Sequence, residues 1–477
     1  MEALDRLADR CLMPGFVGTE PPGWLLRRAQ HLGGVCLYSR NVAGPDQVAA
    51  LNRRLHAENP GLVIGIDEEG GDVTRLEAAT GSSYPGNLAL GEVDDVELTR
   101  SVALSMGAEV ALAGVDLDLA PVADVNSNAA NPVIGVRAFG AEPALVARHT
   151  AAWVEGLQGS GVAACVKHFP GHGATSLDSH LALPAVDEDP RDGALEPFQA
   201  AFAAGALAVM SAHIVVRTID STPATVSGMV MTTLLRDELG FDGLAVSDGL
   251  EMRAISDGVG IAEGAVLALA AGCDLLCIGG GLAGEDVVDL LRDAIVSAVR
   301  EGRLEEQRLV KAANRIDRLM QWRSEQHAPN AGSREVGLEA ARRAVRADGP
   351  AHLGSTAVVV QLASTPSQAA GVVPWGLAGP LRDRGVAVAA IELNRAPAGV
   401  DGLVREAKDK SLVLVARNLH RHPWQVTVVE SVLALRPDAI TVEMGLPGCR
   451  PAGAAAYVAT YGAARVCGLA AAEALTR

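Results

Sequence analysis

Five titratable side chains lie within fourteen consecutive residues, 167–180, which read KHFPGHGATSLDSH. Near the end of this stretch, Asp178 and His180 are two residues apart. In extended backbone such side chains point the same way, with Ser179 facing away, so the carboxylate and the ring can form a hydrogen bond. A carboxylate on one ring nitrogen fixes the tautomer and supports the imidazolium, which makes the other nitrogen a general acid and base near neutral pH. The spacing therefore predicts an acid/base dyad, and the small residues of GHGATSL predict a loop that lets the dyad move.

A candidate nucleophile is Asp248, in the stretch GFDGLAVSDGLEM at 240–252. It follows a short apolar run, so we expect it at the end of a strand, where a carboxylate can attack a carbon that bears a good leaving group. The alternative is a helix N-cap, because Ser247 and Asp248 precede GLEMRAI and both residue types cap helices well. Spacing alone leaves both interpretations open.

Two further stretches contain residue types that bind sugar hydroxyls. GIDEEGGDVTRL at 65–76 contains Asp67 and Arg75, and NPVIGVRAFG at 131–140 contains Arg137. A carboxylate and a few cations that converge on a pocket can form bidentate hydrogen bonds to vicinal hydroxyls. The other acids of the first stretch are expected to be solvated or structural: Glu68, Glu69 and Asp72.

Two alternatives for the stretch 167–180 assign it other chemistry. His168 and His172 are four residues apart, which on a helix would suit a metal ion, but Pro170 and Gly171 between them disfavour a helix. Lys167 could instead form a Schiff base, as in an aldolase-like barrel whose glycines at 278–281 hold a phosphate. A lysine at a strand end is also a good hydrogen-bond donor to a neutral hydroxyl, which is the simpler role for Lys167. We expect neither a metal nor a cofactor.

The elements that must position these residues follow a repeating pattern over the first 325 residues. Seven short apolar, β-branched runs alternate with longer amphipathic stretches: 33–41, 62–67, 115–125, 163–168, 206–213, 243–248 and 273–281. Continuous apolar runs are typical of strands buried on both faces, and helices between them imply βαβ crossovers. We therefore predict a (β/α)8-type barrel, irregular because only seven strands are evident, with an open doubly wound sheet as the alternative.

Polar residues at the ends of these runs should meet at the barrel mouth, where active sites lie. They are Asp67, Asp124, Lys167, His168, His213 and Asp248. The barrel is expected to span 1–325, followed by a polar linker and helix at 326–350. A smaller α/β sandwich domain is expected at 351–477, with strands at 356–363, 386–393, 411–418 and 438–445.

Composition excludes some classes of partner. The formal net charge of −17 argues against binding to nucleic acid, which needs clustered cations. The N-terminus has no apolar signal region, and no run of 18 apolar residues suits a membrane span. Seven cysteines, mostly inside apolar runs, favour buried thiols in a reducing compartment. We expect a cytoplasmic monomer or homodimer that acts on a small molecule.

Together these motifs resemble glycoside hydrolase family 3, and within it the β-N-acetylglucosaminidase branch. The stretch 167–180 is similar to that branch's signature almost throughout. The similarity extends over DEEGGDVTRL, LAPVADVN, NPVIGVRAFG, VMSAHI and GFDGLAVSD. Two positions depart from the branch: Gly249, where Asp or Ala is common, and Glu68, where Gln is common.

The resemblance implies a retaining hydrolase of terminal β-linked N-acetylglucosamine, with an amino-sugar glycoside as substrate and a role such as cell-wall recycling. It implies that Asp248 is the nucleophile, with His180 as proton donor and acceptor and Asp178 as its partner. Its implied sugar-binding residues are Asp67, Arg75, Arg137, Lys167 and His168, and the C-terminal domain need not contribute to catalysis. One alternative is a phosphorylase, because a neutral histidine does not repel inorganic phosphate; another is an inactive sugar-binding protein.

Overall fold

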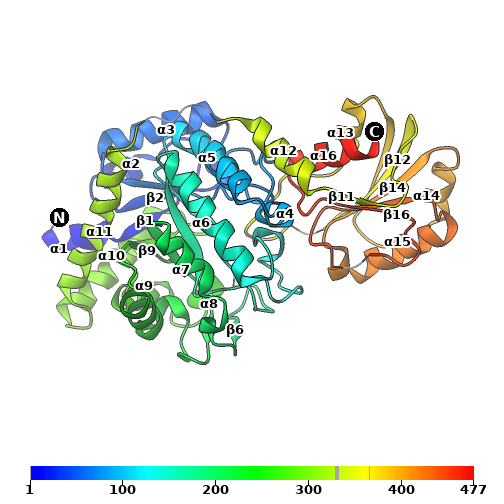
Figure 1. Ribbon diagram of the computed structural model, residues 1–477. Coiled ribbons are helices and arrows are strands. Elements are labelled where there is room, and N and C mark those ends of the chain that lie inside the picture. Colours follow the sequence, from blue (N-terminus) through cyan, green and yellow to red (C-terminus); the bar gives the residue numbers. More distant parts are fainter. Residues whose placement is uncertain (1, 180, 328–331, 365, 449) are drawn as a thin grey trace. The chain divides into compact units, whose positions relative to one another are not determined.

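The computed structural model describes residues 2–179, 181–327, 332–364, 366–448 and 450–477 (Figure 1). The chain divides into two compact units. The first consists of Met1–Glu69, Thr99–Ile134 and Ala141–Gly332, and the second of Gly70–Leu98, Gly135–Gly140 and Ser333–Arg477. The second unit thus includes two short segments from the part of the chain that the sequence assigned to the barrel. The domain boundaries drawn from the sequence stay a prediction.

The first unit is built on parallel strands. Six form one sheet in the order β2 (Gly34–Leu37), β3 (Val63–Ile66), β4 (Leu117–Asp118), β5 (Ala163–Phe169), β7 (Ala208–Ser211) and β9 (Leu244–Val246). Two more pair with each other, β1 (Leu12–Pro14) and β10 (Leu276–Ile278). A parallel bridge between Val246 and Leu275 joins β9 to β10, and the Leu12 carbonyl accepts the Gly33 N–H beside β2. Within the described residues these eight strands follow one another round a barrel.

The predicted (β/α)8-type barrel is therefore confirmed, and the open-sheet alternative is wrong. The strand that the sequence did not reveal is β1, which has only three residues and ends in a proline. Side chains from successive strands fill the barrel interior, among them Met13, Cys36, Leu117 and Cys165. The interior is a packed core, so the functional surface must lie at one end of the strands.

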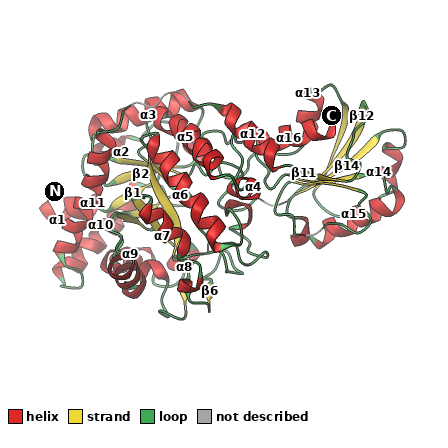
Figure 2. Cartoon of the chain, viewed as in Figure 1, coloured by secondary structure: helices red, strands yellow, loops and turns green. Residues whose placement is uncertain are grey.

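Helices surround these strands (Figures 1 and 2). They are α1 (Ala3–Arg10), α2 (Gly23–Ala29), α3 (Pro45–Glu58), α5 (Val96–Leu112), α6 (Pro143–Gly159), α7 (Glu196–Ala203), the π-helix η5 (Met229–Glu238), α8 (Arg253–Ser256), α9 (Ile261–Ala271), α10 (Glu285–Arg300) and α11 (Glu306–Ser324). Single turns of 3-10 helix form η1 (Ser39–Asn41), η3 (Pro190–Asp192) and η4 (Ala224–Val226), and β6 (Ala185–Val186) pairs with β8 (Val215–Val216) outside the barrel. Proline stands in the first turn of α3, α6 and α7, where its missing N–H has no helical partner to lose.

The second unit is an α/β sandwich. Its sheet has the order β11 (Arg346–Asp348), β16 (Ala456–Ala459), β15 (Ile440–Glu443), β14 (Ser411–Ala416), β12 (Thr356–Leu362) and β13 (Ala387–Leu393), with only β11 antiparallel. Its helices are α4 (Asn87–Val93), α12 (Arg334–Ala344), α13 (Ala378–Asp383), α14 (Asp401–Glu406), α15 (Pro423–Leu435) and α16 (Arg465–Leu475), with turns η2 (Gly135–Arg137) and η6 (Leu419–Arg421).

The side chains of β12 alternate between two hydrophobic cores, which explains why this unit has three layers. Ala357 and Val359 belong to a core with α12, α13 and α16, whereas Val358 and Val360 belong to a core with α14 and α15. Successive side chains of a strand point to opposite faces, so both faces of the sheet are covered. The predicted sandwich is confirmed.

None of the helices that the structure describes is both long enough and apolar enough to cross a membrane.

Candidate active site

Lys167 is the centre of a charged cluster at the carboxyl ends of β3 and β5. Its Nζ lies 2.6 Å from Asp67 Oδ1 and 2.7 Å from Glu69 Oε1. Lys167 and Glu69 are buried, and the Asp67 side chain is 18% exposed. Two neighbouring carboxylates favour the charged form of Lys167, which has no lone pair with which to attack a carbonyl, so this arrangement disfavours the Schiff-base alternative. Of the two roles expected for Glu69, solvated or structural, the structure supports the structural one, because the buried Glu69 carboxylate pairs with Lys167.

Asp118 is the last residue of β4 and lies beside the turn that follows β3. It is fully buried, and its Oδ1 accepts the Glu68 N–H at 2.9 Å. Burial raises the pKa of Asp118 well above its ordinary value, the carboxylates of Glu68 and Asp67 add to the rise, and Lys167 opposes it. The raised pKa favours the neutral form of Asp118, and its carboxyl oxygen accepts the backbone N–H of Glu68 in the turn after β3.

His168 is oriented by Asp124, a fully buried aspartate. The ring Nδ1 lies 2.7 Å from Asp124 Oδ2, and Asp124 Oδ1 accepts the backbone N–H groups of His168 at 3.3 Å and His172 at 2.6 Å. Burial alone would raise the pKa of Asp124, but the charge and hydrogen bond of His168 outweigh it and lower the pKa. Because an ionised carboxylate only accepts, His168 Nδ1 bears a proton and the ring is held in one orientation.

Asp248 follows β9 at the same end of the barrel. Its Oδ1 accepts the Gly249 N–H at 2.8 Å. The next helix, α8, begins only at Arg253 and has Met252 at its N-cap position. The N-cap interpretation of Asp248 is therefore wrong, and the carboxylate is placed at a strand end as the nucleophile hypothesis requires.

His213 fixes the backbone next to Asp248. This fully buried ring has Nε2 at 3.0 Å from the Gly249 carbonyl oxygen and Nδ1 at 2.7 Å from Thr225 Oγ1. Since a carbonyl only accepts, Nε2 donates to Gly249, while Nδ1 shares a hydrogen bond with the Thr225 hydroxyl. His213 thus connects the end of β7 to the loop after β9, a role that its position at a strand end suggested but did not specify.

The loop after β5 contains the predicted acid/base dyad. The Asp178 carbonyl accepts N–H groups from Leu181 and Ala182, both at 3.0 Å. Ser179 is buried and points to the ring of His172, away from the solvent. His180 lies outside the described residues, and the pairing of Asp178 with His180 stays a prediction. Among the described side chains, no group of three or more His, Cys, Asp or Glu residues is placed to bind a metal ion.

Arg75 and Arg137 belong to the second unit. Arg75 Nη2 donates to the Ala369 carbonyl at 2.8 Å, and the carbonyl of Arg137 accepts from Asn87 Nδ2 at 2.8 Å. The segment around Arg75 is attached through Asp72, which forms an ion pair with Arg417 at 2.5 Å and accepts the Ala463 N–H at 2.9 Å. The structure therefore brings together Asp67, Lys167, His168 and Asp248 in the first unit and describes the two arginines with the second.

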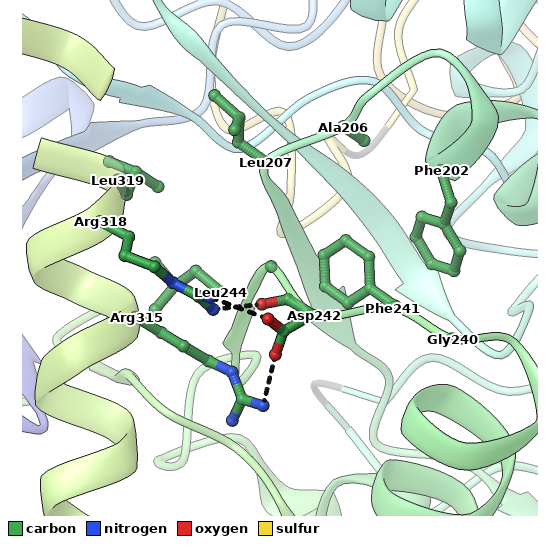
Figure 3. Close-up of a pocket in the computed structure, with 11 residues that line it drawn as sticks. Phe202, Ala206, Leu207, Gly240, Phe241, Asp242, Leu244, Arg315, Arg318 and Leu319 are labelled. Atoms are coloured by element: carbon green, nitrogen blue, oxygen red, sulfur yellow. Dashed lines mark hydrogen bonds and ion pairs between the residues drawn. The ribbon is translucent and has the colours of Figure 1, made fainter. Parts of the chain in front are cut away.

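A pocket of about 380 Å³ at the other end of the barrel is a poor candidate for the active site (Figure 3). Leu207 and Leu244 line it at the amino ends of β7 and β9. Figure 3 shows Asp242 bound by two arginines of α11, Arg318 at 2.8 Å and Arg315 at 3.0 Å. Residues at this end of a (β/α) barrel stabilise the fold, whereas catalytic residues occupy the carboxyl ends of the strands.

Comparison with known proteins gives a consistent result. Residues 25–319 match the model of the glycosyl hydrolase family 3 N terminal domain. The chain is 39% identical over 260 residues to a beta-hexosaminidase of Alkalilimnicola ehrlichii, covering 52% of this chain and 74% of the relative. It is 39% identical over 257 residues to a beta-hexosaminidase of Thiobacillus denitrificans, covering 52% and 71%. A solved glycoside hydrolase family 3 beta-N-acetylglucosaminidase from Paenibacillus sp. has a TM-score of 0.90 and 33% identity, covering 100% of this chain and 97% of that one.

Proposed function

Because the chain belongs to glycosyl hydrolase family 3 and is a glycoside hydrolase, we propose that it removes terminal β-linked N-acetylglucosamine from small glycosides with retention of configuration. The observation that supports this most is the carboxylate of Asp248 at a strand end, in the same barrel mouth as the Asp67, Lys167 and Glu69 cluster. A nucleophile and a set of hydroxyl-binding groups at one mouth suit attack on a sugar.

Asp248 is the nucleophile in this proposal. Its carboxylate oxygen attacks the anomeric carbon while the glycosidic C–O bond breaks, giving a covalent glycosyl-enzyme. Gly249 donates its N–H to the carboxylate, and His213 holds the Gly249 carbonyl, so the attacking group is kept in place before substrate binds. A preorganised nucleophile loses less freedom in the transition state.

His180 transfers the protons, with Asp178 as its partner. It protonates the departing glycosidic oxygen, then removes a proton from the water whose oxygen attacks the anomeric carbon and releases Asp248. This assignment rests on the DSH motif, since His180 is outside the described residues.

Asp67, Lys167 and His168 are the proposed ligands of the sugar hydroxyls in the barrel mouth. A lysine ammonium has three N–H donors, and the contacts with the Asp67 and Glu69 carboxylates fix the direction of the Lys167 side chain. The sequence also assigns Arg75 and Arg137 to the sugar; both assignments stay predictions.

The test is Asp248→Asn, assayed with an aryl β-N-acetylglucosaminide. We expect turnover to fall by roughly 10⁴- to 10⁶-fold, the range found on removal of single members of a catalytic triad, with the folded state kept. Asp242→Asn, the same exchange at the opposite end of the barrel, is the matched control and should keep its activity. Near-normal activity of Asp248→Asn would refute the nucleophile assignment.

A panel of aryl β-glycosides of glucose, N-acetylglucosamine and xylose, each assayed with and without phosphate, tests the substrate and the acceptor. The proposal expects preference for the N-acetylated sugar and free sugar as the product. A sugar 1-phosphate as the main product would support the phosphorylase alternative instead. Tight binding of the sugar without turnover would support an inactive sugar-binding protein.

A further inference from the structure

His172 is a buried histidine to which the proposed mechanism assigns no part. Its exposed fraction is 2%, and both ring nitrogens have hydrogen-bond partners. Nδ1 lies 2.8 Å from Thr175 Oγ1, and Nε2 lies 3.2 Å from Ser179 Oγ. The ring therefore spans the loop after β5, from the turn that follows the strand to the residue just after Asp178.

The backbone of His172 is held by residues outside this loop. Its N–H donates to Asp124 Oδ1 at 2.6 Å, and its carbonyl accepts from Asn131 Nδ2 at 2.9 Å. The next residue, Gly173, packs so closely against the Val125 carbonyl that a Cβ would lie 1.7 Å from that oxygen. This end of the loop is thus a fixed root attached to the segment after β4.

Ser179 is the other end of the link. It is as buried as His172; its hydroxyl contacts the ring, and its carbonyl accepts the Ala254 N–H at 3.4 Å. Ser179 also separates Asp178 from His180 in the chain. The link therefore ends at the residue that joins the two members of the predicted dyad in the sequence.

The ring of His172 is suited to a structural hydrogen-bonding role between two parts of the loop and not to proton transfer. Burial lowers the pKa of His172 to about 4, although the Asp124 carboxylate opposes this effect. His168 is the other titratable ring beside it, at 6.0 Å between ring centroids in an edge-on arrangement. A neutral imidazole donates at one nitrogen and accepts at the other, which matches two hydroxyl partners that can each do either.

We propose that His172 and Ser179 are positioning residues for the acid/base dyad: the imidazole connects the fixed root of the loop to the serine between Asp178 and His180. The proposal rests on the proposed function and extends it to residues that do not touch the substrate. Loss of the link should impair protonation of the leaving group and leave attack by Asp248 largely intact.

The first test is Ser179→Ala, assayed with two aryl β-N-acetylglucosaminides that differ only in the leaving group. With methoxyphenyl, a poor leaving group that needs the acid, we expect kcat/KM to fall roughly 3- to 10-fold, the effect of one hydrogen bond. With dinitrophenyl, which departs with little protonation, the fall should be less than about twofold. Ser179→Thr retains the hydroxyl and should recover the methoxyphenyl rate.

A second pair of variants tests the ring. His172→Asn retains an amide near the Nδ1 position but does not reach Ser179, so it should behave as Ser179→Ala does. His172→Gln places its amide near the Nε2 position and should keep the link. The double variant Ser179→Ala with His172→Asn should lose no more than either alone, because both remove one contact.

Ser160→Ala is the matched control, since its buried hydroxyl donates to the Leu157 carbonyl at 2.6 Å near the amino end of β5. It should leave the ratio of the two rates unchanged. An equal fall with both leaving groups, or no fall with either, would overturn the positioning role. Asp248→Asn assayed in parallel separates the two proposals, because its continued activity would refute the proposed function whatever the ratio.

Discussion

Replacing Asp118 by asparagine tests how charge is balanced beneath the active-site mouth. Asp118 is fully buried on β4, and its Oδ1 accepts the Glu68 N–H. Within the described part of the chain, its Oδ2 has no hydrogen-bond partner. Burial, together with the neighbouring carboxylates of Glu68 and Asp67, raises the pKa of Asp118 despite the nearby Lys167. We therefore expect a neutral carboxyl that an amide can replace.

The expected magnitude follows from proton linkage. An acid that stays protonated in the folded state but ionises in the unfolded chain costs about 1.4 kcal/mol for each pH unit above its unfolded pKa. The stabilising contribution of Asp118 to the free energy of unfolding is thus complete below the ordinary pKa of 3.8. It is lost as the pH rises through the raised pKa of the folded state. Asparagine has no such dependence. Between pH 5 and pH 8, Asp118→Asn should gain up to about 4 kcal/mol relative to the parent.

The assay is urea denaturation of the full chain at both pH values, with unfolding monitored by the loss of activity. Asp118→Asn keeps the acceptor for the Glu68 N–H, whereas Asp118→Ala leaves that buried N–H without one and should cost about 1–3 kcal/mol at either pH. If the Asp118→Asn variant is less stable than the parent by the same amount at both pH values, or by more at pH 8, the neutral carboxyl is refuted.

Two further predictions concern charged groups at opposite ends of the barrel. Lys167→Met leaves the Asp67 and Glu69 carboxylates without their shared cation, so we expect the free energy of unfolding to fall by about 3 kcal/mol or more and kcat/KM to fall with it; an unchanged denaturation midpoint would contradict this. Hydrogen bonds from Arg318 and Arg315 lower the pKa of Asp242 to about 2, so its stabilising contribution is present above pH 3.8 and is lost as pH falls toward 2. In Asp242→Asn the free energy of unfolding should fall slightly less steeply with pH in that window, and the change should be small because the Asp242 side chain is 68% exposed. An acid transition as steep as that of the parent would count against this prediction.

The sequence was sufficient to predict the fold class because strands that are buried on both faces consist almost entirely of apolar residues. Strands such as Ala163–Phe169 read as apolar runs with a polar end, and the order of runs and helices implies the barrel. The strand Leu12–Pro14 was not evident, since three residues contain too little pattern to distinguish a strand from a turn. It is a strand because β10 and β2 on either side need a neighbour to close the barrel.

The sequence by itself determined which residue types are available at the mouth: Asp67, Lys167, His168 and Asp248 each follow or end an apolar run. Only the tertiary structure decided what these groups contact. Lys167 meets Asp67 across 100 residues of chain, and burial that no local pattern records raises the pKa of Asp118. The helix-cap interpretation of Asp248 was excluded in the same way, by where the next helix begins. Contacts between distant residues, and the desolvation that they cause, arise only when the strands are placed side by side. For that reason the sequence suggests the chemistry of this site, whereas the charge state of each group depends on the folded arrangement.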